Sequence, residues 1–339
     1  MKKIQLLASV AVFAAAFSAA PVLAADTLIG LITKNNTNPF FVKMKEGAEA
    51  AAKAGGLKFQ AYAGKVDGDA GPQIEAIENL IAAGAKGILI TASNDTVIPA
   101  LKKARKAGIL VIALDTPISD PEATDATFAT DNFQAGVLIG QWAKATLGDK
   151  AAAAHIGMLD INKDNISVDV GRDTGFLKGF GIDVPDPKVM GSEKDKRVIG
   201  HESSQANPEG GVKSAENLLQ KEPAMNLVYT INEPAAEGAF QALKKAGKEK
   251  GVTIVSVDGG CPGVKSVKEG VIGATSMQFP LLMASKGVEA IAAFAKDGAK
   301  PKNSDGLTFY NTGVELITDH PVAGVKSITS EEGLKKCWG

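Results

Sequence analysis

Short apolar stretches of strand length alternate with amphipathic stretches of helix length along most of this 339-residue chain. The first strand is expected at 27–33, where a continuous apolar run is typical of a strand buried on both faces. Asn38-Pro39 then places an N-cap residue before a proline at the first helical position, and Gly55-Gly56 ends that helix. Because strands that alternate with helices favour parallel sheets joined by right-handed crossovers, the alternation predicts an α/β fold.

The same alternation continues along the rest of the chain. We expect further strands at 57–62, 87–90, 109–114, 154–159, 227–231 and 252–257, and helices at 72–83, 95–107, 175–180, 211–220 and 235–246. Residues 100–104 and 242–246 both read Ala-Leu-Lys-Lys-Ala, and each precedes a strand that ends in an aspartate, Asp115 or Asp258. In open α/β sheets ligands bind beyond the carboxyl ends of the strands. The sequence therefore predicts two similar doubly wound parallel-sheet lobes that share one cleft.

The first residues have the pattern of a secretory signal peptide. Met1-Lys2-Lys3 is a short positive start, residues 4–20 are almost entirely apolar, and Val22-Leu23-Ala24 matches a signal-peptidase site. We expect residues 1–24 to be removed, with cleavage after Ala24. The alternative is a membrane anchor, but the apolar run is short for a span and no second run follows.

The mature chain is mildly acidic. Without Lys2 and Lys3 it has 35 basic residues against 38 acidic residues, a net charge of −3. This charge gives no electrostatic reason to bind nucleic acid or anionic lipid. An exported chain also meets an oxidising compartment, where its two cysteines, Cys261 and Cys337, are expected to form a disulfide rather than two free thiols.

No enzymatic signature appears in the sequence, which lacks the nucleophile elbow, the Walker loop and the dinucleotide-binding glycine pattern. The three histidines lie far apart and lack the spacing of metal ligands: His155, His201 and His320. Residues 160–164 resemble the opening of a calcium loop, but Asn165 and Gly171 stand where such a loop needs Gly and Glu. We therefore expect no catalytic activity, cofactor or metal, and interpret 160–164 as a polar loop.

Polar and aromatic residues gather instead at the expected strand ends. Planar hydrogen-bonding groups suit sugar hydroxyls, and aromatic rings suit the C–H faces of a sugar. The first kind comprises Asn38, Asp115, Arg172, Asn232, Asp258 and Gln278, and the second comprises Phe40 and Phe41. Each also has a structural interpretation: Asn38 and Asn232 as helix caps, Phe41 as core, and the strand-end aspartates as turn formers.

Seven segments, in order along the mature chain, resemble the ribose-type periplasmic sugar-binding proteins. They are 37–41 (Thr-Asn-Pro-Phe-Phe), 111–116 (Val-Ile-Ala-Leu-Asp-Thr), 129–132 (Ala-Thr-Asp-Asn), 171–176 (beginning Gly-Arg), 232–233 (Asn-Glu), 257–259 (Val-Asp-Gly) and 277–280 (Met-Gln-Phe-Pro). The set as a whole is specific, although only the first segment and the late glutamine are distinctive alone.

This resemblance implies the type I periplasmic binding protein fold, in which two α/β lobes joined by a three-segment hinge close over one sugar. The implied N-terminal lobe comprises 25–130 and 279–308, and the C-terminal lobe comprises 131–278 and 309–339. Carried over motif by motif, the implied ligand-binding residues are Asn38, Phe40, Phe41, Asn94, Asp115, Thr116, Arg172, Asn232, Asp258 and Gln278.

The resemblance also implies function. The protein would capture a monosaccharide in the periplasm and deliver it, as a monomer, to an ABC transporter permease in the inner membrane, with a chemoreceptor as a further candidate partner. Thr116 stands where ribose binders of this type usually have Arg, and the third stacking aromatic expected near 201–205 has no clear equivalent. The sequence as a whole resembles the fructose-binding members of the family more closely, so fructose is favoured over mannose or ribose.

Three other hypotheses for the function remain open. A receptor that presents a furanosyl signal such as an autoinducer would use the same fold. A transcriptional regulator with this core is disfavoured by the signal peptide and the missing helix-turn-helix. An exported enzyme of unknown reaction is disfavoured because no nucleophile–base pair or metal set is visible.

Overall fold

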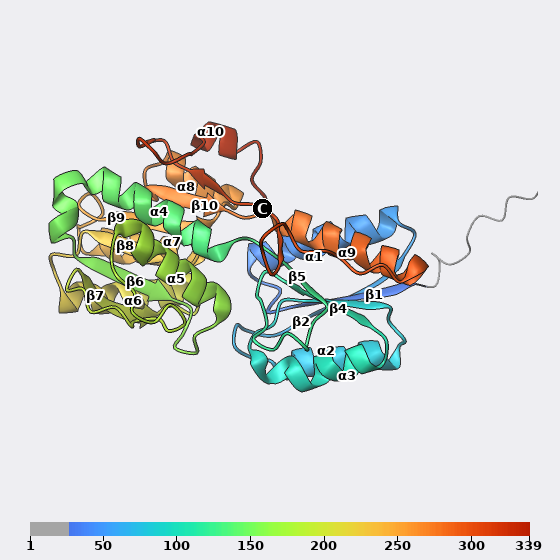
Figure 1. Cartoon of the computed structure of the whole chain (residues 1–339). Helices are drawn as coiled ribbons and strands as arrows, with labels where there is room; N and C mark the ends of the chain where they lie inside the picture. Colours follow the sequence, from blue (N-terminus) through green and yellow to red (C-terminus); the bar gives the residue numbers. More distant parts are fainter. Residues whose placement is uncertain (1–26) are drawn as a thin grey trace, which may run out of the picture.

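The computed structural model describes residues 27–339 and has two α/β lobes, each built on a six-stranded sheet (Figure 1). The predicted signal peptide at 1–24 lies outside the described residues. In the first lobe the strand order is β11-β5-β4-β3-β1-β2, and every neighbouring pair is parallel. The strands are β1 (Leu28–Thr33), β2 (Lys58–Ala63), β3 (Gly87–Ile90), β4 (Leu110–Leu114), β5 (Ala126–Ala129) and β11 (Tyr310–Asn311).

The second sheet has the same plan, with the order β12-β10-β9-β8-β6-β7. Five of its strands are parallel, and β12 pairs antiparallel with β10 at the edge. The strands are β6 (Ile156–Asp160), β7 (Val198–Ser203), β8 (Leu227–Thr230), β9 (Thr253–Asp258), β10 (Ala274–Met277) and β12 (Glu315–Ile317). The two similar lobes and the parallel sheets predicted from the alternating pattern are therefore confirmed.

Helices cover both faces of the first sheet. α1 (Pro39–Ala54) and α9 (Pro280–Asp297) pack on one face, and α2 (Gly71–Ala82) and α3 (Ile98–Lys106) on the other, with the short 3₁₀ turn η1 (Asp95–Val97) before α3. Successive residues of β4 face opposite sides, so Ile112 joins the core beneath α1 and α9 while Val111 joins the core beneath α2 and α3. Burial on both faces explains why the strands are continuous apolar runs.

The second sheet is covered in the same way. α4 (Asn132–Leu147) and α5 (Ser167–Phe180) pack on one face, and α6 (Pro208–Lys221), α7 (Glu233–Lys245) and α8 (Cys261–Lys268) on the other. The 3₁₀ helix η2 (Gly148–Ala153) follows α4, and the single turn α10 (Ser330–Gly333) lies near the C-terminus. No helix in the described range is long and apolar enough to span a membrane.

Helices α4 and α5 approach each other unusually closely because glycines line their contact. A Cβ atom on Gly136 or Gly140 would clash with backbone oxygens of α5, and one on Gly175 or Gly179 would clash with backbone oxygens of α4. Glycine therefore allows the two backbones to touch. Since α4 begins directly after a crossing between the lobes, this contact holds α5 close to the cleft.

The chain crosses between the lobes three times: after β5, after β10 and after β11. The first two crossings fall near residues 130 and 278. The third follows Asn311, because β11 pairs with β5 in the first sheet and Tyr310 packs against Phe128 at 5.0 Å between ring centroids. The first sheet thus extends past the boundary expected at residue 308, and a strand of two residues is too short to recognise from sequence periodicity.

Candidate ligand-binding cleft

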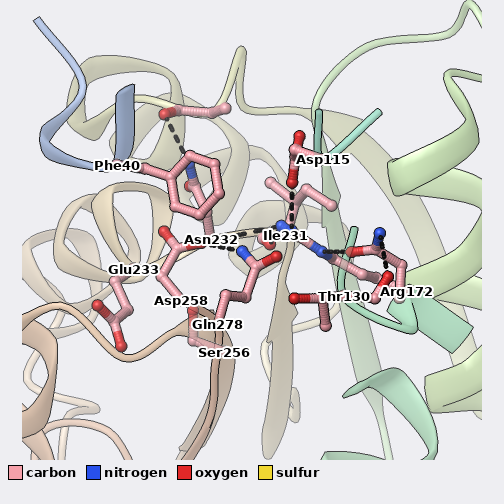
Figure 2. Close-up of polar contacts among 12 residues, drawn as sticks. Phe40, Asp115, Thr130, Arg172, Ile231, Asn232, Glu233, Ser256, Asp258 and Gln278 are labelled. Carbon is pink, nitrogen blue, oxygen red and sulfur yellow. Dashed lines mark hydrogen bonds and ion pairs between the residues drawn. The ribbon is translucent and has the colours of Figure 1, made fainter. Parts of the chain in front are cut away.

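The carboxyl ends of the strands of both sheets meet at a small cavity of about 30 Å³ between the lobes. Figure 2 shows the polar side chains that converge there. The cavity is lined by Lys34, Asn38, Phe40, Phe41, Asp67, Asp115, Ile161, Val168, Arg172, Ala206, Ile231, Asn232, Asp258 and Gln278. Space of this size accommodates about one or two water molecules, so a larger ligand enters only when the lobes or side chains move apart.

The first lobe supplies two aromatic rings from the start of α1. Asn38 caps this helix, since its Oδ1 accepts a hydrogen bond from the backbone N–H of Phe40 at 2.9 Å. Pro39 occupies the first helical position, and the fixed cap sets the direction of the two residues that follow. Phe40 and Phe41 are almost fully buried and pack edge to face, with ring centroids 5.4 Å apart.

Asp115 follows β4 with the backbone in a left-handed conformation, at φ 62°. Its N–H donates to the carbonyl of Phe128, and one carboxylate oxygen accepts from the Thr116 hydroxyl at 2.8 Å. The other oxygen, Oδ1, is buried without a hydrogen-bond partner. A non-glycine residue at positive φ is typical of a position held by its surroundings for function, and the unpartnered oxygen can accept a ligand hydrogen.

Arg172 on α5 is buried between the two lobes (Figure 2). Its Nε donates to Asn132 Oδ1 at 2.8 Å and one terminal nitrogen donates to the carbonyl of Ile231 at 2.9 Å. The guanidinium also lies 3.8 Å from Asp115 of the first lobe and 4.0 Å from Asp258 of the second. The arginine therefore carries the positive charge that balances two carboxylates facing each other across the cleft.

Three residues at neighbouring strand ends complete the second lobe's side. Asn232 caps α7, with Oδ1 accepting from Ala235 N–H at 3.1 Å and its amide donating to the Ala206 carbonyl. The Gln278 amide donates to Asp258 Oδ1 at 3.0 Å, while its Oε1 is buried without a partner. Gln278 Oε1 therefore remains an open acceptor on this side of the cleft, and such an acceptor suits a ligand hydroxyl.

The turn that follows Asp258 is held by Glu233, a residue that does not line this cavity. Glu233 accepts hydrogen bonds from the N–H groups of Gly259 and Gly260 and from the Thr275 hydroxyl, all between 2.8 and 2.9 Å. Burial, together with the neighbouring charge of Asp258, raises the pKa of Glu233 to about 8, although its three hydrogen bonds oppose the shift. Burial also raises the pKa of Asp258 to about 7, although Arg172 and the Gln278 amide oppose the shift.

Eight of the residues expected from sequence line the cavity together, and two do not. Thr116 is buried beside the cavity and contributes through its hydrogen bond to Asp115. Asn94 lies farther off: its side chain caps η1 by accepting from Thr96 and donates to the Gly68 carbonyl. The polar atoms of Asn94 are therefore hydrogen-bonded within the first lobe, away from the cavity.

Sequence reasoning missed several residues of the site. Lys34 and Asp67 line the cavity, and burial raises the pKa of Asp67 although the Lys34 charge opposes this. Lys34 directly follows β1, so its place after an apolar strand was a usable signal. Asp67 lies in an irregular loop that no sequence pattern marks. Glu233 and Asn132 fall in the segments 232–233 and 129–132, but the resemblance did not imply them as ligand-binding residues because they act only through their neighbours.

The two cysteines form the disulfide that the sequence predicted, with Cα atoms 5.0 Å apart. The bond ties the C-terminal tail to the start of α8 and brings Trp338 against Gly260, whose loop contains Asp258. The Trp338 indole donates to the Gln278 carbonyl at 2.9 Å, and its ring lies 5.5 Å from that of Phe40. The tail of the second lobe thus contacts the aromatic pair of the first.

Comparison with known proteins agrees with this architecture. Residues 29–300 match the family model described as a periplasmic binding protein domain. The chain is 30% identical to the ribose import binding protein of Escherichia coli K12 over 292 residues, which cover 85% of this chain and 91% of that protein. It is 28% identical to the D-apiose import binding protein of Paraburkholderia graminis, covering 84% and 86% of the two chains.

Solved structures share the fold. An ABC transporter periplasmic solute-binding protein from Actinobacillus succinogenes with bound D-allose superposes with a TM-score of 0.73 at 22% identity, covering 91% of this chain and 99% of that one. A solute-binding protein from Bacillus halodurans with bound myo-inositol gives a TM-score of 0.76 at 18% identity, covering 94% and 100%. Since the family model spans most of both lobes, the chain belongs to the periplasmic binding protein family.

Proposed function

We propose that this protein is the monosaccharide-binding component of an ABC transporter and that fructose is its preferred sugar, with mannose and ribose as related candidates. The observation that carries the proposal is the convergence of Asp115, Arg172 and Asp258 with two phenylalanine rings in one buried cleft. Carboxylates and a guanidinium hydrogen-bond several hydroxyls at once, and the rings suit the C–H face of a sugar. The relatives named for ribose and apiose import support the sugar class.

Capture would proceed by hinge closure. Contacts that join the lobes already exist around the cavity: Arg172 faces Asp115 at 3.8 Å, and the Ser167 hydroxyl donates to the Pro117 carbonyl at 2.8 Å. An open form would separate these pairs and admit the sugar. Because a bound sugar contacts both lobes only in the closed form, it favours closure.

The preference for fructose over ribose rests on Thr116. Where ribose binders of this type usually have Arg after the aspartate, the short Thr116 side chain hydrogen-bonds to Asp115 instead of reaching a ligand. Compared with ribose binders of this type, the cleft therefore lacks one bidentate hydrogen-bond donor and has more space beside Asp115.

The remaining parts of the proposal concern location and partners. The protein would be exported by the signal peptide at residues 1–24, cleaved after Ala24, and would act as a monomer in the periplasm. The closed form would be recognised by the permease in the inner membrane, and a chemoreceptor is a further candidate partner. A second candidate function is a receptor for a furanosyl signal, because the same acceptors and donors suit a furanose ring.

Calorimetric titration of the mature protein with fructose, mannose, ribose and a furanosyl signal tests the proposal. We expect fructose to bind most tightly, and Arg172→Lys to weaken binding at least about tenfold because lysine cannot reproduce the two-pronged geometry. Arg197→Lys is the matched control, since Arg197 pairs with Asp195 elsewhere in the second lobe. If folded, ligand-free protein binds none of the sugars but binds the furanosyl signal, the receptor function replaces the transport function.

A further inference from the structure

A second group of charged residues lies in the C-terminal lobe between β6, β7 and α5, apart from the residues that line the cleft. Asp160 ends β6, Asp169 and Asp173 lie one turn apart on α5, Glu193 lies in the loop before β7, and His201 is on β7. We call these five residues the His201 cluster. Three of these carboxylates, those of Asp160, Asp173 and Glu193, lie within 3.5 Å of a ring nitrogen of His201.

The cluster is buried and short of hydrogen bonds. Asp169 and Asp173 are 0% exposed and Asp160 is 4% exposed. Both carboxylate oxygens of Asp173 lack a hydrogen-bond partner, as do one oxygen each of Asp160, Asp169 and Glu193. Buried carboxylates in proteins are normally paired, hydrogen-bonded or bound to a metal. The nearest basic atom to the Asp173 carboxylate is His201 Nδ1, 3.5 Å from Oδ2, so this fully buried aspartate has no close hydrogen-bonding partner and indicates a missing positive one.

The histidine is oriented in the way that metal-binding histidines are. Glu193 lies 2.9 Å from Nε2, while Nδ1 lies 2.7 Å from Asp160 and 3.5 Å from Asp173. With its proton on Nε2, held by Glu193, the imidazole would turn its Nδ1 lone pair toward the two aspartates, as in carboxylate–histidine–metal arrangements. Nδ1 and one oxygen from each of these aspartates lie within 4.8 Å of one another.

We propose that Asp160, Asp173 and His201 bind a divalent transition-metal cation, with Zn²⁺ favoured, and that Glu193 holds the imidazole in place. One imidazole nitrogen with carboxylate oxygens is a donor set typical of Zn²⁺, and Mn²⁺ accepts the same set more weakly. Ca²⁺ prefers oxygen ligands alone. The site differs from the calcium loop considered at 160–171, because α5 begins at Ser167 and Asp164 is exposed.

Sequence spacing hides such a site. Asp160 and His201 are 41 residues apart and meet only because β6 and β7 are neighbours in the sheet, where Met158 pairs with His201. This explains why the histidines showed no metal-ligand spacing. The inference does not depend on the sugar proposed for the cleft, since its readout is the cation itself.

The test is a metal titration of the mature protein after chelator treatment and dialysis. We expect Zn²⁺ to raise the melting temperature by several degrees and to bind at one equivalent per chain by elemental analysis, because a ligand that binds only the folded state stabilises it. Asp173→Asn and His201→Gln should abolish both effects. Asp173→Asn should fold, because it neutralises one carboxylate of an acidic cluster. His201→Gln removes the partner of Asp160 and Glu193 and should cost stability, so Asp173→Asn is the variant that decides the test.

Asp183→Asn and His155→Gln are the matched controls. Asp183 is exposed, and His155 is half-buried beside Glu222 away from the cluster. These controls should keep the full Zn²⁺ shift and stoichiometry. Equal shifts in the control and cluster variants would assign the binding to surface sites and overturn the proposal. Absence of any shift with Zn²⁺ and Mn²⁺ in the unaltered protein would overturn it too, and would leave the imidazolium as the cluster's only cation.

Discussion

At the scale of single residues, the cleft depends on a carboxylate that its surroundings force into an unusual backbone. Asp258 has φ 153° and is followed by Gly259 at φ 76°, and Glu233 fixes both following N–H groups. A side chain on Gly259 would also clash with Met277. The turn is thus determined by Glu233 and by lack of space, and it presents Asp258 to Arg172 and Gln278.

The raised pKa of Asp258 predicts how stability varies with pH. Because burial raises this pKa to about 7 from an ordinary value of 3.8, the folded protein keeps a proton that the unfolded chain releases. The contribution of Asp258 to stability is therefore complete below about pH 4 and lost as the pH rises through about 7. The free energy of unfolding of the sugar-free protein should therefore fall between about pH 4 and 7.

Urea denaturation across this pH range, with Asp258→Asn as the comparison, checks the prediction. Asparagine does not titrate, so the variant should lose less stability with rising pH than the unaltered protein. Asp183→Asn, an exposed control, should keep the original slope. An unchanged slope in Asp258→Asn would show that other groups, such as the His201 cluster, cause the dependence.

At the scale of elements, α5 joins three features of the second lobe. It carries Arg172 into the cleft, Asp169 and Asp173 into the His201 cluster, and Gly175 into the contact with α4. Nine of its fourteen residues are buried, which leaves it little amphipathic character. Only its stretch at 175–180 was expected from sequence, because a helix buried on several sides lacks the periodic apolar stripe that marks a surface helix.

The glycine contact gives a prediction about stability. Gly175→Ala should destabilise the protein by about 1–3 kcal/mol, because the added Cβ meets the Phe133 carbonyl oxygen and forces α4 and α5 apart. Gly251→Ala is the control, since the nearest atom to its added Cβ is 3.8 Å away. Chemical denaturation measures both. A cost for Gly175→Ala no larger than that of the control would mean that α4 shifts freely.

At the scale of the whole molecule, the disulfide fixes the tail of the second lobe to α8, beside Trp338, whose ring contacts Phe40 of the first lobe. Cys261 and Cys337 are 76 residues apart in sequence, so their bond removes considerable freedom from the unfolded chain. Replacing both by serine should cost about 2–4 kcal/mol. It should also loosen Trp338, whose ring contacts Phe40 and whose indole donates to Gln278.

Thermal unfolding with and without reductant checks this expectation. Reductant should lower the melting temperature of the unaltered protein. It should not change the melting temperature of the double-serine variant, which has no disulfide to reduce and is therefore the control. Tryptophan emission in a Trp142→Phe background reports on Trp338 alone, because the chain has two tryptophans. Emission that does not shift to the red on reduction would show that packing, rather than the bond, holds the tail.

The sequence predicted much of this architecture for physical reasons. Strands such as β3 and β4 are buried on both faces of the sheet, so they are continuous apolar runs that the sequence shows directly. N-cap residues such as Asn38 likewise mark where helices begin. Several cleft residues could be predicted because ligands of parallel α/β sheets bind beyond the carboxyl ends of the strands. The sequence did not predict the short strand β11 or the residues of the His201 cluster, because both depend on pairing between segments that are distant in the chain.

The route of the chain also bears on its synthesis. The first lobe needs α9 to cover α1 and β11 to extend its sheet, yet these segments lie at 280–297 and 310–311, after nearly all of the second lobe. A ribosome therefore completes neither lobe before it has made most of the protein. Domains that close on contiguous segments can fold as they emerge. This chain instead stays without a finished core until late in translation, a property suited to passage through a membrane channel that admits only unfolded polypeptide.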